Sequence, residues 1–579
     1  MNNFKTFWPY ISKYKRELMI GIAALIITDS MTLLVPWLIK GFIDVLPSKP
    51  PSGILLEYTF FLLIIVLFLV VGRYGWRMYM FGPSRKIEFD ILNRLFGHFL
   101  TLDRAWYLKQ SIGDIMSRAT NDLRAVREFV GLGILILIDA VFVIITAVGM
   151  MCWINSDLAL RVLLPLPFIS FLFFYFVKKI GKRHKAVQEH LALITRQVQE
   201  NLSGIRVLHA FVQEENEKIK FAALNNEYIK KNLHVTRLFG VFTPTMVFMT
   251  GIASILSLWL GGKYVITGSM TLGSLVAFNG YLMLLSWPMM GIGYVFNITQ
   301  KGMSAMSRIN EVFAAQSEII SVPEGVSSYE KIGEIEFKAL QFSYPDTDIL
   351  SLKGVDIKVS KGQVLGVVGV IGSGKTTLAQ MLLRFYDPIA GNLFIGSHPI
   401  KNIPLKKLRN SVGYVSQDPF LFSTSIRENI LLGRDVGLDL EEIVRVTRLK
   451  DDIERFPNGL DTLIGERGVS LSGGQKQRVA LARALITKPE VLILDDAFSS
   501  LDSDTEEEIL RNIRTLLIQT TTLIISHRLS SVRDADKIIV LDKGQIIEKG
   551  SHDSLIRAGG VYASLFKNQS LAREMEVYL

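Results

Sequence analysis

The sequence predicts a chain of two domains, an all-α membrane domain followed by an α/β domain. Hydrophobic residues make up 49% of the 579 residues, and the mean hydropathy of +0.32 is high for a chain of this length outside a membrane. The apolar residues gather in the first half of the chain, whereas short Val- and Ile-rich runs alternate with helical patterns in the second half. That alternation is typical of α/β domains with a largely parallel sheet.

Six apolar stretches have about the ~20 residues that are needed to cross a bilayer core. They are residues 18–38, 58–75, 132–154, 158–177, 241–260 and 275–298. The long connections 82–130 and 178–238 are polar and helical in pattern, so we expect helical extensions beyond the bilayer. We therefore predict a six-helix membrane domain with long cytoplasmic extensions over residues 1–316, a linker over 317–332 and the α/β domain over 333–579.

The charge distribution predicts the orientation. The net charge is +10, and the long connections between spans are rich in Lys and Arg. Because such segments remain on the cytoplasmic side, both termini and the α/β domain are expected in the cytoplasm. The single cysteine, Cys152, excludes an intrachain disulfide and any multi-cysteine metal site, and we expect it to be buried as a small hydrophobe.

A glycine-rich motif in the second half predicts a phosphate site. "VLGVV" reads as a buried strand, "GVIGSGKT" fits the P-loop pattern, and a helical run follows. Backbone N–H groups of such a loop surround phosphate oxygens at a helix N-terminus. The nucleotide-binding residues are expected to be Gly369, Val370, Ile371, Gly372, Ser373, Gly374, Lys375, Thr376 and Thr377, with Lys375 at the β/γ-phosphates and Thr376 on Mg²⁺.

Two adjacent carboxylates end the apolar run "VLILDD". Asp495, at the end of a buried strand, is expected to hold Mg²⁺ directly or through water, which is the second half of a P-loop site. Just before this strand, "LSGGQ" precedes the helical run "KQRVALARAL". Its serine hydroxyl, backbone N–H groups and helix dipole could together hold an anion.

These motifs resemble those of ATP-binding cassette (ABC) transporters, and the resemblance covers essentially the whole chain. It is closest to the type IV exporter architecture, in which two half-transporters make one pump. The resemblance implies that ATP and Mg²⁺ are the cofactors and that the "LSGGQ" signature, Leu471, Ser472, Gly473, Gly474 and Gln475, contacts the γ-phosphate held by the other cassette. Two ATP molecules would then join two cassettes until hydrolysis weakens the joint.

The resemblance implies roles for further residues. Tyr344 would stack on adenine, Gln417 would contact Mg²⁺ and the attacking water, and His527 would lie near the γ-phosphate. The segment 464–468 would link the nucleotide state to the membrane helices. The interface loop between cassettes would be Ser499, Ser500, Leu501 and Asp502. Short coupling helices are expected around residues 106–112 and 207–214, the second on the opposite chain's cassette.

The second carboxylate of "VLILDD" departs from the family pattern. Active members of the family typically have a glutamate there, which orients or deprotonates the attacking water, whereas this chain has Asp496. A side chain one methylene shorter withdraws the carboxylate by roughly 1 Å, which can cost ~100-fold in rate. With an intact signature, the chain resembles the degenerate subunit of heterodimeric multidrug-type exporters. We expect a homologous partner chain carrying the glutamate; a homodimer with a slow aspartate is the alternative.

Two acids, Asp29 and Asp139, lie within predicted spans, where charges are costly and usually face a cavity or a partner. Either could line a transport pathway and favour cationic substrates, or form a helix–helix hydrogen bond. The resemblance implies ATP-driven export of amphipathic, drug- or lipid-like compounds across a bacterial cytoplasmic membrane. Uptake of a metal–siderophore complex and an ATP-gated regulatory subunit are the alternatives, and no nucleic-acid partner is expected.

Overall fold

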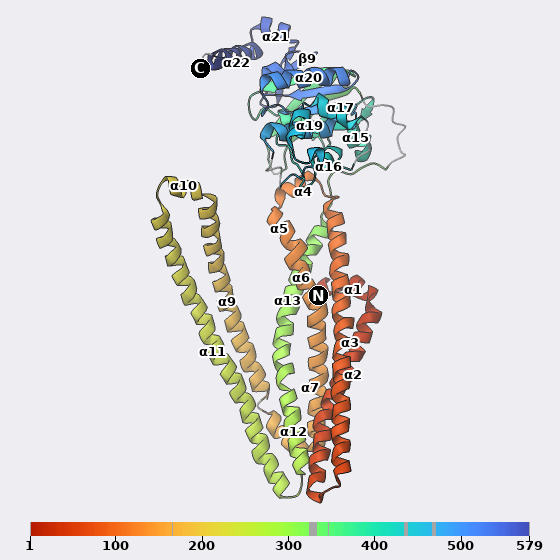
Figure 1. Ribbon diagram of the computed structural model, residues 1–579, viewed down its shortest axis with the longest axis vertical. Helices are drawn as coiled ribbons and strands as arrows, with labels where there is room; N and C mark the ends of the chain where they lie inside the picture. The colour runs from red at the N-terminus through yellow and green to blue at the C-terminus, as the bar shows by residue number, and fades with distance from the viewer. Residues whose placement is uncertain are drawn as a thin grey trace. The chain divides into compact units, whose positions relative to one another are not determined.

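The structure, a computed structural model, describes residues 2–164, 166–323, 333–345, 347–433, 438–465 and 471–577. It divides into two compact units (Figure 1). The helical unit comprises Met1–Thr101 and Ser111–Ala315, and the α/β unit comprises Leu102–Gln110 and Gln316–Leu579. A short segment from within the first half of the sequence therefore belongs to the α/β unit.

The helical unit is built from long helices with short pieces between them. Its α-helices are α1 (Asn2–Lys13), α2 (Lys15–Val45), α3 (Ser52–Phe99), α5 (Ile112–Ser117), α6 (Leu123–Glu128), α7 (Ile134–Ile154), α8 (Ser156–Leu163), α9 (Leu166–Ser203), α10 (Ile205–Ala210), α11 (Glu214–Ile266), α12 (Leu272–Leu284) and α13 (Ser286–Ala314). The 48 residues of α3 extend for about 70 Å at ~1.5 Å per residue, more than twice a bilayer core of ~30 Å. The expected helical extensions are present.

Helices α9 and α11 pack side by side and are joined by α10 at one end (Figure 1). Their polar halves pack through Ile180, Val187 and Val235, and His190 Nε2 lies 2.9 Å from the carbonyl oxygen of Leu224. The predicted last span is divided, because α12 ends at Leu284 and α13 begins at Ser286. Pro288 lies in the first turn of α13, where its missing N–H costs no hydrogen bond.

Four helical stretches in the described residues are long and apolar enough to cross a membrane: Lys15–Ser48, Ser52–Phe99, Ile112–Ile154 and Leu272–Ala314. They contain four of the predicted spans, and a shorter apolar helix, Gly251–Ile266, overlaps a fifth. The remaining predicted span, 158–177, covers most of α8 and the start of α9 and includes Pro165, which is outside the described residues. The count of six spans stays a prediction.

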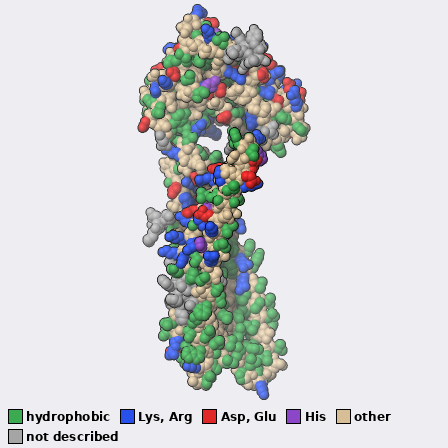
Figure 2. Space-filling view, turned by 90° about the vertical axis from the view of Figure 1, so that its left-hand side faces the viewer, with side chains coloured by type: hydrophobic (Ala, Val, Ile, Leu, Met, Phe, Trp, Pro, Cys, Tyr) green, Lys and Arg blue, Asp and Glu red, His purple; other side chains and the backbone are tan. Residues whose placement is uncertain are grey.

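The outer face of these helices is apolar. Only 6% of the most apolar window of α3 is buried within the chain, and Figure 2 shows hydrophobic side chains gathered over the lower part of the helical unit, with Lys and Arg side chains above them. Such a large exposed apolar surface suits contact with lipid. Cys152 belongs to this surface; the expectation that it is buried was wrong, because it points away from the core that its neighbour Met151 joins.

The α/β unit contains two sheets with helices between and around their strands. Its strands are β1 (Ile335–Ser343), β2 (Leu350–Val359), β3 (Val364–Gly369), β4 (Ala390–Ile395), β5 (His398–Pro399), β6 (Val412–Val415), β7 (Val491–Asp495), β8 (Thr521–Ile525), β9 (Lys537–Asp542) and β10 (Gln545–Gly550). Its α-helices are α4 (Arg104–Lys109), α14 (Lys375–Leu382), α15 (Leu405–Ser411), α16 (Ile426–Leu431), α17 (Leu440–Val446), α18 (Lys450–Arg455), α19 (Gly473–Leu485), α20 (Ser503–Leu516), α21 (His552–Ala558) and α22 (Val561–Val577).

The larger sheet has the strand order β10-β9-β3-β8-β7-β6, and all its pairs are parallel except β10 with β9. The smaller sheet, β2-β1-β4-β5, is antiparallel. Strands β7 and β8 are buried along their whole length, which explains their continuous apolar runs. The predicted α/β unit with a largely parallel sheet is confirmed.

Helix α4 packs within the α/β unit. Ala105 is 6% exposed and joins the core cluster that contains Phe342 and Tyr386. The Arg104 guanidinium lies 5.6 Å from the ring centroid of Phe385, and Asp103 Oδ2 accepts a 2.6 Å hydrogen bond from the backbone of Glu318. The segment that the sequence suggested as a first coupling helix is therefore integrated into this unit.

Candidate nucleotide-binding site

The site lies where four parallel strands end. β3 ends at Gly369 and leads into the P-loop, β7 ends at Asp495, and β8 ends at Ile525, two residues before His527. The edge strand β6 ends at Val415, two residues before Gln417. Because neighbouring parallel strands share their carboxyl edge, this topology brings four distant segments together, as in other open α/β sheets.

A pocket of about 420 Å³ occupies this edge, within the range of small-ligand sites. Its lining includes most of the predicted residues: Tyr344, Ile371, Gly372, Ser373, Gly374, Lys375, Thr376, Thr377, Gln417, Asp495, Asp496 and His527, together with Ser351 and Ile525. Gly369 and Val370 contribute through their carbonyl groups, which bind Lys375. The structure thus gathers the predicted nucleotide-binding and catalytic residues of this chain in one pocket.

The P-loop has the backbone that a phosphate cradle requires. Gly374 has φ +102°, and a Cβ there would lie 2.6 Å from the carbonyl oxygen of Ser351, so only glycine fits. Helix α14 begins at the next residue, so its free N–H groups face the pocket. Lys375 is buried, and its Nζ donates 2.9 Å hydrogen bonds to the carbonyls of both Gly369 and Val370. The loop therefore fits a polyphosphate.

Thr376 and Asp495 form a donor set suited to Mg²⁺. Thr376 Oγ1 donates a 3.2 Å hydrogen bond to Asp495 Oδ1, and Asp495 is only 1% exposed. Burial raises the pKa of Asp495 to about 6, against the opposing effects of this hydrogen bond and of Lys375. Among the described residues, nothing donates to Asp495 Oδ2, and a buried carboxylate oxygen of this kind suits a hard cation.

Asp496 follows in a left-handed backbone conformation, with φ +51°, which Asp adopts more readily than most residues. Its N–H donates to the carbonyl of Ile525 at 2.8 Å, which fixes it beside the strand that precedes His527. Burial lowers the pKa of His527, as does the charge of Lys375, whereas Asp496 opposes the shift. The imidazole is therefore neutral at pH 7 and can donate one N–H.

Tyr344 lines the pocket with its ring packed edge-on against Phe342 and Tyr386. Its hydroxyl is 3.0 Å from Thr377 Oγ1 and donates to Gln380 Oε1 at 3.2 Å. These contacts fix the ring next to the first turn of α14, where an adenine could stack. Its stacking role stays a prediction.

The signature residues lie outside this pocket, at the start of α19. Ser472 is the N-cap: its Oγ accepts a 3.2 Å hydrogen bond from Gln475 N, and Gln475 Oε1 accepts one of 2.9 Å from Ser472 N. A hydroxyl that accepts in this way still has its own proton to donate to an anion. A Cβ on Gly474 would lie 3.1 Å from the carbonyl oxygen of Ser500, so the small residues let the interface loop approach the signature.

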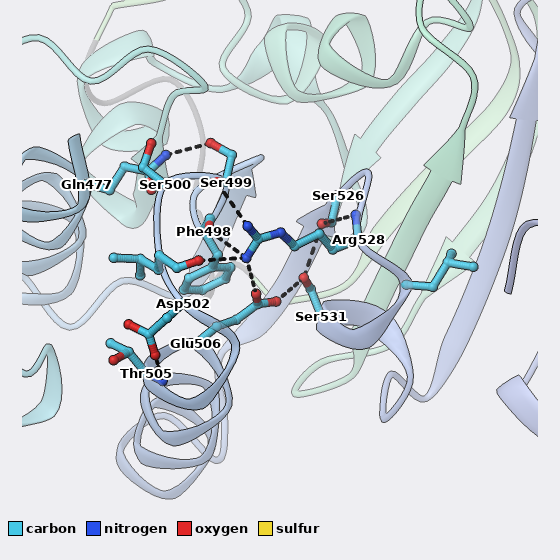
Figure 3. Close-up of polar contacts among 12 residues, drawn as sticks. Gln477, Phe498, Ser499, Ser500, Asp502, Thr505, Glu506, Ser526, Arg528 and Ser531 are labelled. Atoms are coloured by element: carbon cyan, nitrogen blue, oxygen red, sulfur yellow. Dashed lines mark hydrogen bonds and ion pairs between the residues drawn. The ribbon is translucent and has the colours of Figure 1, made fainter. Parts of the chain in front are cut away.

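The interface loop is held by residues that the sequence motifs did not indicate (Figure 3). Gln477, on α19, donates from Nε2 to Ser499 Oγ at 2.8 Å and accepts from Ser500 N at 2.9 Å. Asp502 ends the loop as the N-cap of α20, where it accepts a hydrogen bond from Thr505 N. The only sequence signal for Gln477 was its position two residues after the signature.

Arg528 binds the interface loop from the side opposite Gln477 (Figure 3). Its guanidinium donates to the carbonyl of Ser499 at 3.1 Å and to that of Leu501 at 2.8 Å. It also pairs at 3.1 Å with Glu506, which is only 2% exposed and accepts a hydrogen bond from Ser531. Because Arg528 directly follows His527, this arginine connects the histidine segment to the interface loop.

In the helical unit, Asp29 of α2 and Asp139 of α7 lie close enough for their carboxyl groups to interact, with Arg73 of α3 nearby. Asp29 is 9% exposed and Asp139 is half-buried. The predicted segment 464–468 lies mostly outside the described residues, which end at Gly465 and resume at Leu471.

Comparisons with known proteins agree with this geometry. Residues 18–289 match the family model described as ABC transporter transmembrane region, and residues 352–499 match the family model described as ABC transporter. The chain is 35% identical over 572 residues to a probable multidrug resistance ABC transporter ATP-binding/permease protein, YheI, of Bacillus subtilis, covering 98% of this chain and 96% of that protein.

A second relative is the multidrug resistance-like ATP-binding protein MdlA of Escherichia coli, 35% identical over 574 residues, with 98% of this chain and 97% of that protein covered. Among solved structures, a bacterial Atm1-family ABC exporter with ATP bound has the same fold, with a TM-score of 0.80 at 24% identity over 96% of this chain and 98% of that chain.

The fold and the pocket define a membrane-embedded, ATP-hydrolysing transport protein with a helical transmembrane domain and an α/β ATP-binding domain. The chain belongs to the ABC transporter family.

Proposed function

We propose that this chain is a half-transporter that exports amphipathic compounds, working with a second chain that carries the stronger catalytic acid. The multidrug-related names of its relatives support export of such compounds. The abundance of Lys and Arg in the long polar extensions supports an orientation with both termini and the α/β unit in the cytoplasm of a bacterial cell.

The observation that carries this proposal is that the ATP pocket and the signature of one chain are separate sites. The pocket gathers the P-loop, Gln417, Asp495, Asp496 and His527, yet no residue of the signature is among its described lining residues. Among the described residues, the signature forms an exposed helix start at Ser472 and Gly473, beside the interface loop. A second cassette supplying the missing half to each pocket explains both features, and ATP then clamps the two cassettes together.

Within the pocket, Lys375 and the P-loop N–H groups hold the β/γ-phosphates, and Tyr344 stacks on the base. Thr376, Asp495 and Gln417 would hold Mg²⁺, which would neutralise charge on the phosphate oxygens. Gln417 and Asp496 orient the attacking water, and the neutral His527 donates its N–H to the γ-phosphate. Turnover at this pocket is slow because the carboxylate of Asp496 stands too far back from the water.

Short helices on the long extensions transmit the ATP-driven closure of the two cassettes to the membrane helices. Helix α4 packs into the α/β unit of its own chain through Ala105. Helix α10, between α9 and α11, leaves apolar side chains exposed beside it, with Phe211 71% and Val212 79% exposed. Such a tip suits docking on the cassette of the second chain, so that closing the cassettes rearranges the helix bundle.

Export is tested in inverted membrane vesicles that contain the complex, with a fluorescent amphipathic cation outside. ATP is expected to drive its accumulation inside, and Lys375→Met to reduce this accumulation by weakening the hold on the phosphates. Uptake of a metal–siderophore complex into right-side-out vesicles would contradict export. An ionic current that needs ATP but no turnover would indicate a gated channel instead.

We further propose that the carboxyl pair Asp29 and Asp139 favours cationic substrates. The carboxyl groups of two acids that face each other between helices can bind a cation, which a bilayer would otherwise exclude. Asp29→Asn and Asp139→Asn are each expected to lower transport of a cationic dye about tenfold, equivalent to one ~1.4 kcal/mol interaction, and to spare a neutral dye. Asp157→Asn, an exposed acid that pairs with Arg161, is the matched control. Unchanged cation transport in both variants would show that the pair only joins helices.

A further inference from the structure

The backbone around Arg528 is clamped by one amide side chain from the C-terminal helix α22. Gln569 Nε2 donates a 2.7 Å hydrogen bond to the carbonyl of His527, and Gln569 Oε1 accepts one of 3.0 Å from the N–H of Leu529. The amide thus pairs with the main chain on both sides of Arg528, as a neighbouring strand would. None of the sequence motifs includes Gln569.

Helix α22 is a firm support for this clamp. At its start, the backbone N–H of Tyr562 donates to Glu548 Oε2 at 3.0 Å. The Tyr562 side chain is fully buried, and its hydroxyl lies 2.8 Å from His552 Nδ1. Gln569 follows two helical turns later, on the same face of the helix as Tyr562. Its position is therefore set by a buried anchor, although Gln569 itself is exposed.

The segment that carries His527 is consequently held from two directions. On one side, Arg528 binds the carbonyls of Ser499 and Leu501 in the interface loop (Figure 3). On the other side, Gln569 holds the carbonyl of His527 itself. Fixing that carbonyl restricts the rotation of the His527 backbone and so the direction of its imidazole.

We infer that Gln569 is a positioning residue for His527, so that the C-terminal helix sets the contact between the histidine and the terminal phosphate of ATP. This inference rests on the proposed role of His527 at the γ-phosphate. ADP lacks that phosphate. The hydrogen bonds of Gln569 therefore affect ATP binding and leave ADP binding unchanged. A residue that only stabilised the fold would affect both nucleotides alike.

The test measures the affinities of the full-length purified transporter for ATP and ADP, by competition with a fluorescent nucleotide. Gln569→Ala is expected to weaken ATP binding roughly 10-fold and to leave ADP binding unchanged. This is about the effect of losing the hydrogen bond from His527 to the charged terminal phosphate. Gln569→Glu keeps the acceptor but cannot donate to the His527 carbonyl, so it should behave like Gln569→Ala. Asn568→Ala, at the neighbouring exposed position on α22, should change neither affinity.

A double variant separates positioning from an independent effect. His527→Ala should lower the preference for ATP at least as much as Gln569→Ala, and the double variant should lose no more than His527→Ala alone. Equal weakening of ATP and ADP, or fully additive losses, would overturn the inference. If His527→Ala leaves the preference unchanged, the proposed role of the histidine fails as well. If only Gln569→Ala has no effect, the inference alone fails.

Discussion

Asp496→Glu is expected to raise ATP turnover at the pocket of this chain by roughly 10- to 100-fold, because the longer side chain carries its carboxylate about 1 Å closer to the attacking water. Other predicted residues of this chain's own pocket, among them Lys375, Thr376, Asp495 and His527, already line it. Steady-state ATPase activity of the purified variant, compared with the unchanged protein, measures the gain.

The backbone at residue 496 and one control variant limit the interpretation of that gain. The backbone of residue 496 is left-handed, so glutamate there costs up to ~1–2 kcal/mol of conformational strain, visible as a lower melting temperature without loss of the rate gain. Asp504→Glu makes the same chemical change at an exposed position of α20 and should not alter turnover. If Asp496→Glu is no faster, the length of the acid does not limit this pocket.

Ser472→Ala is expected to reduce the ATPase activity of the assembled transporter by roughly 10- to 100-fold, although Ser472 is outside the pocket of its own chain. The change removes the N-cap of α19. In our proposal it also removes a hydroxyl that the signature offers to a phosphate. A hydrogen bond to a charged group contributes ~1.5–3 kcal/mol, which corresponds to this range.

The matched control for Ser472→Ala is Ser551→Ala. Ser551 caps α21 in the same manner, accepting a hydrogen bond from Ser554 N, so each variant loses about 1 kcal/mol of helix capping. Only the signature serine should affect hydrolysis. Equal effects of the two variants would mean that lost helix stability, and not a missing phosphate contact, explains the result.

The order of apolar runs in the sequence was enough to predict the fold class. Continuous Val/Ile/Leu runs such as 491–494 are typical of strands buried on both faces, and β7 is fully buried in the structure. The P-loop could be assigned because its glycines, lysine and threonine have fixed spacing. Cys152 could not be placed from composition, since an apolar helix gives no sequence signal for which face meets lipid and which meets its neighbours.

The supports of the site were not predictable in the same way. Arg528 and Glu506 are 22 positions apart, and Gln569 is 41 positions beyond Arg528. Their hydrogen bonds depend on how α20, α22 and the segment after β8 pack, which no local spacing encodes. Glu506 looks like any charged residue in the first turn of a helix, and only the structure shows that it is 2% exposed and paired with Arg528.

In our proposal, this chain binds ATP but hydrolyses it slowly, and completes a faster site on a second chain. The most direct measurement is the ATPase turnover of the chain purified alone, compared with that of the complex with the half-transporter that co-purifies from its native membrane. We expect at least a tenfold higher turnover for the complex, and we expect this gain to be lost when the glutamate of the second chain is replaced. Equal turnover of the chain alone would contradict it.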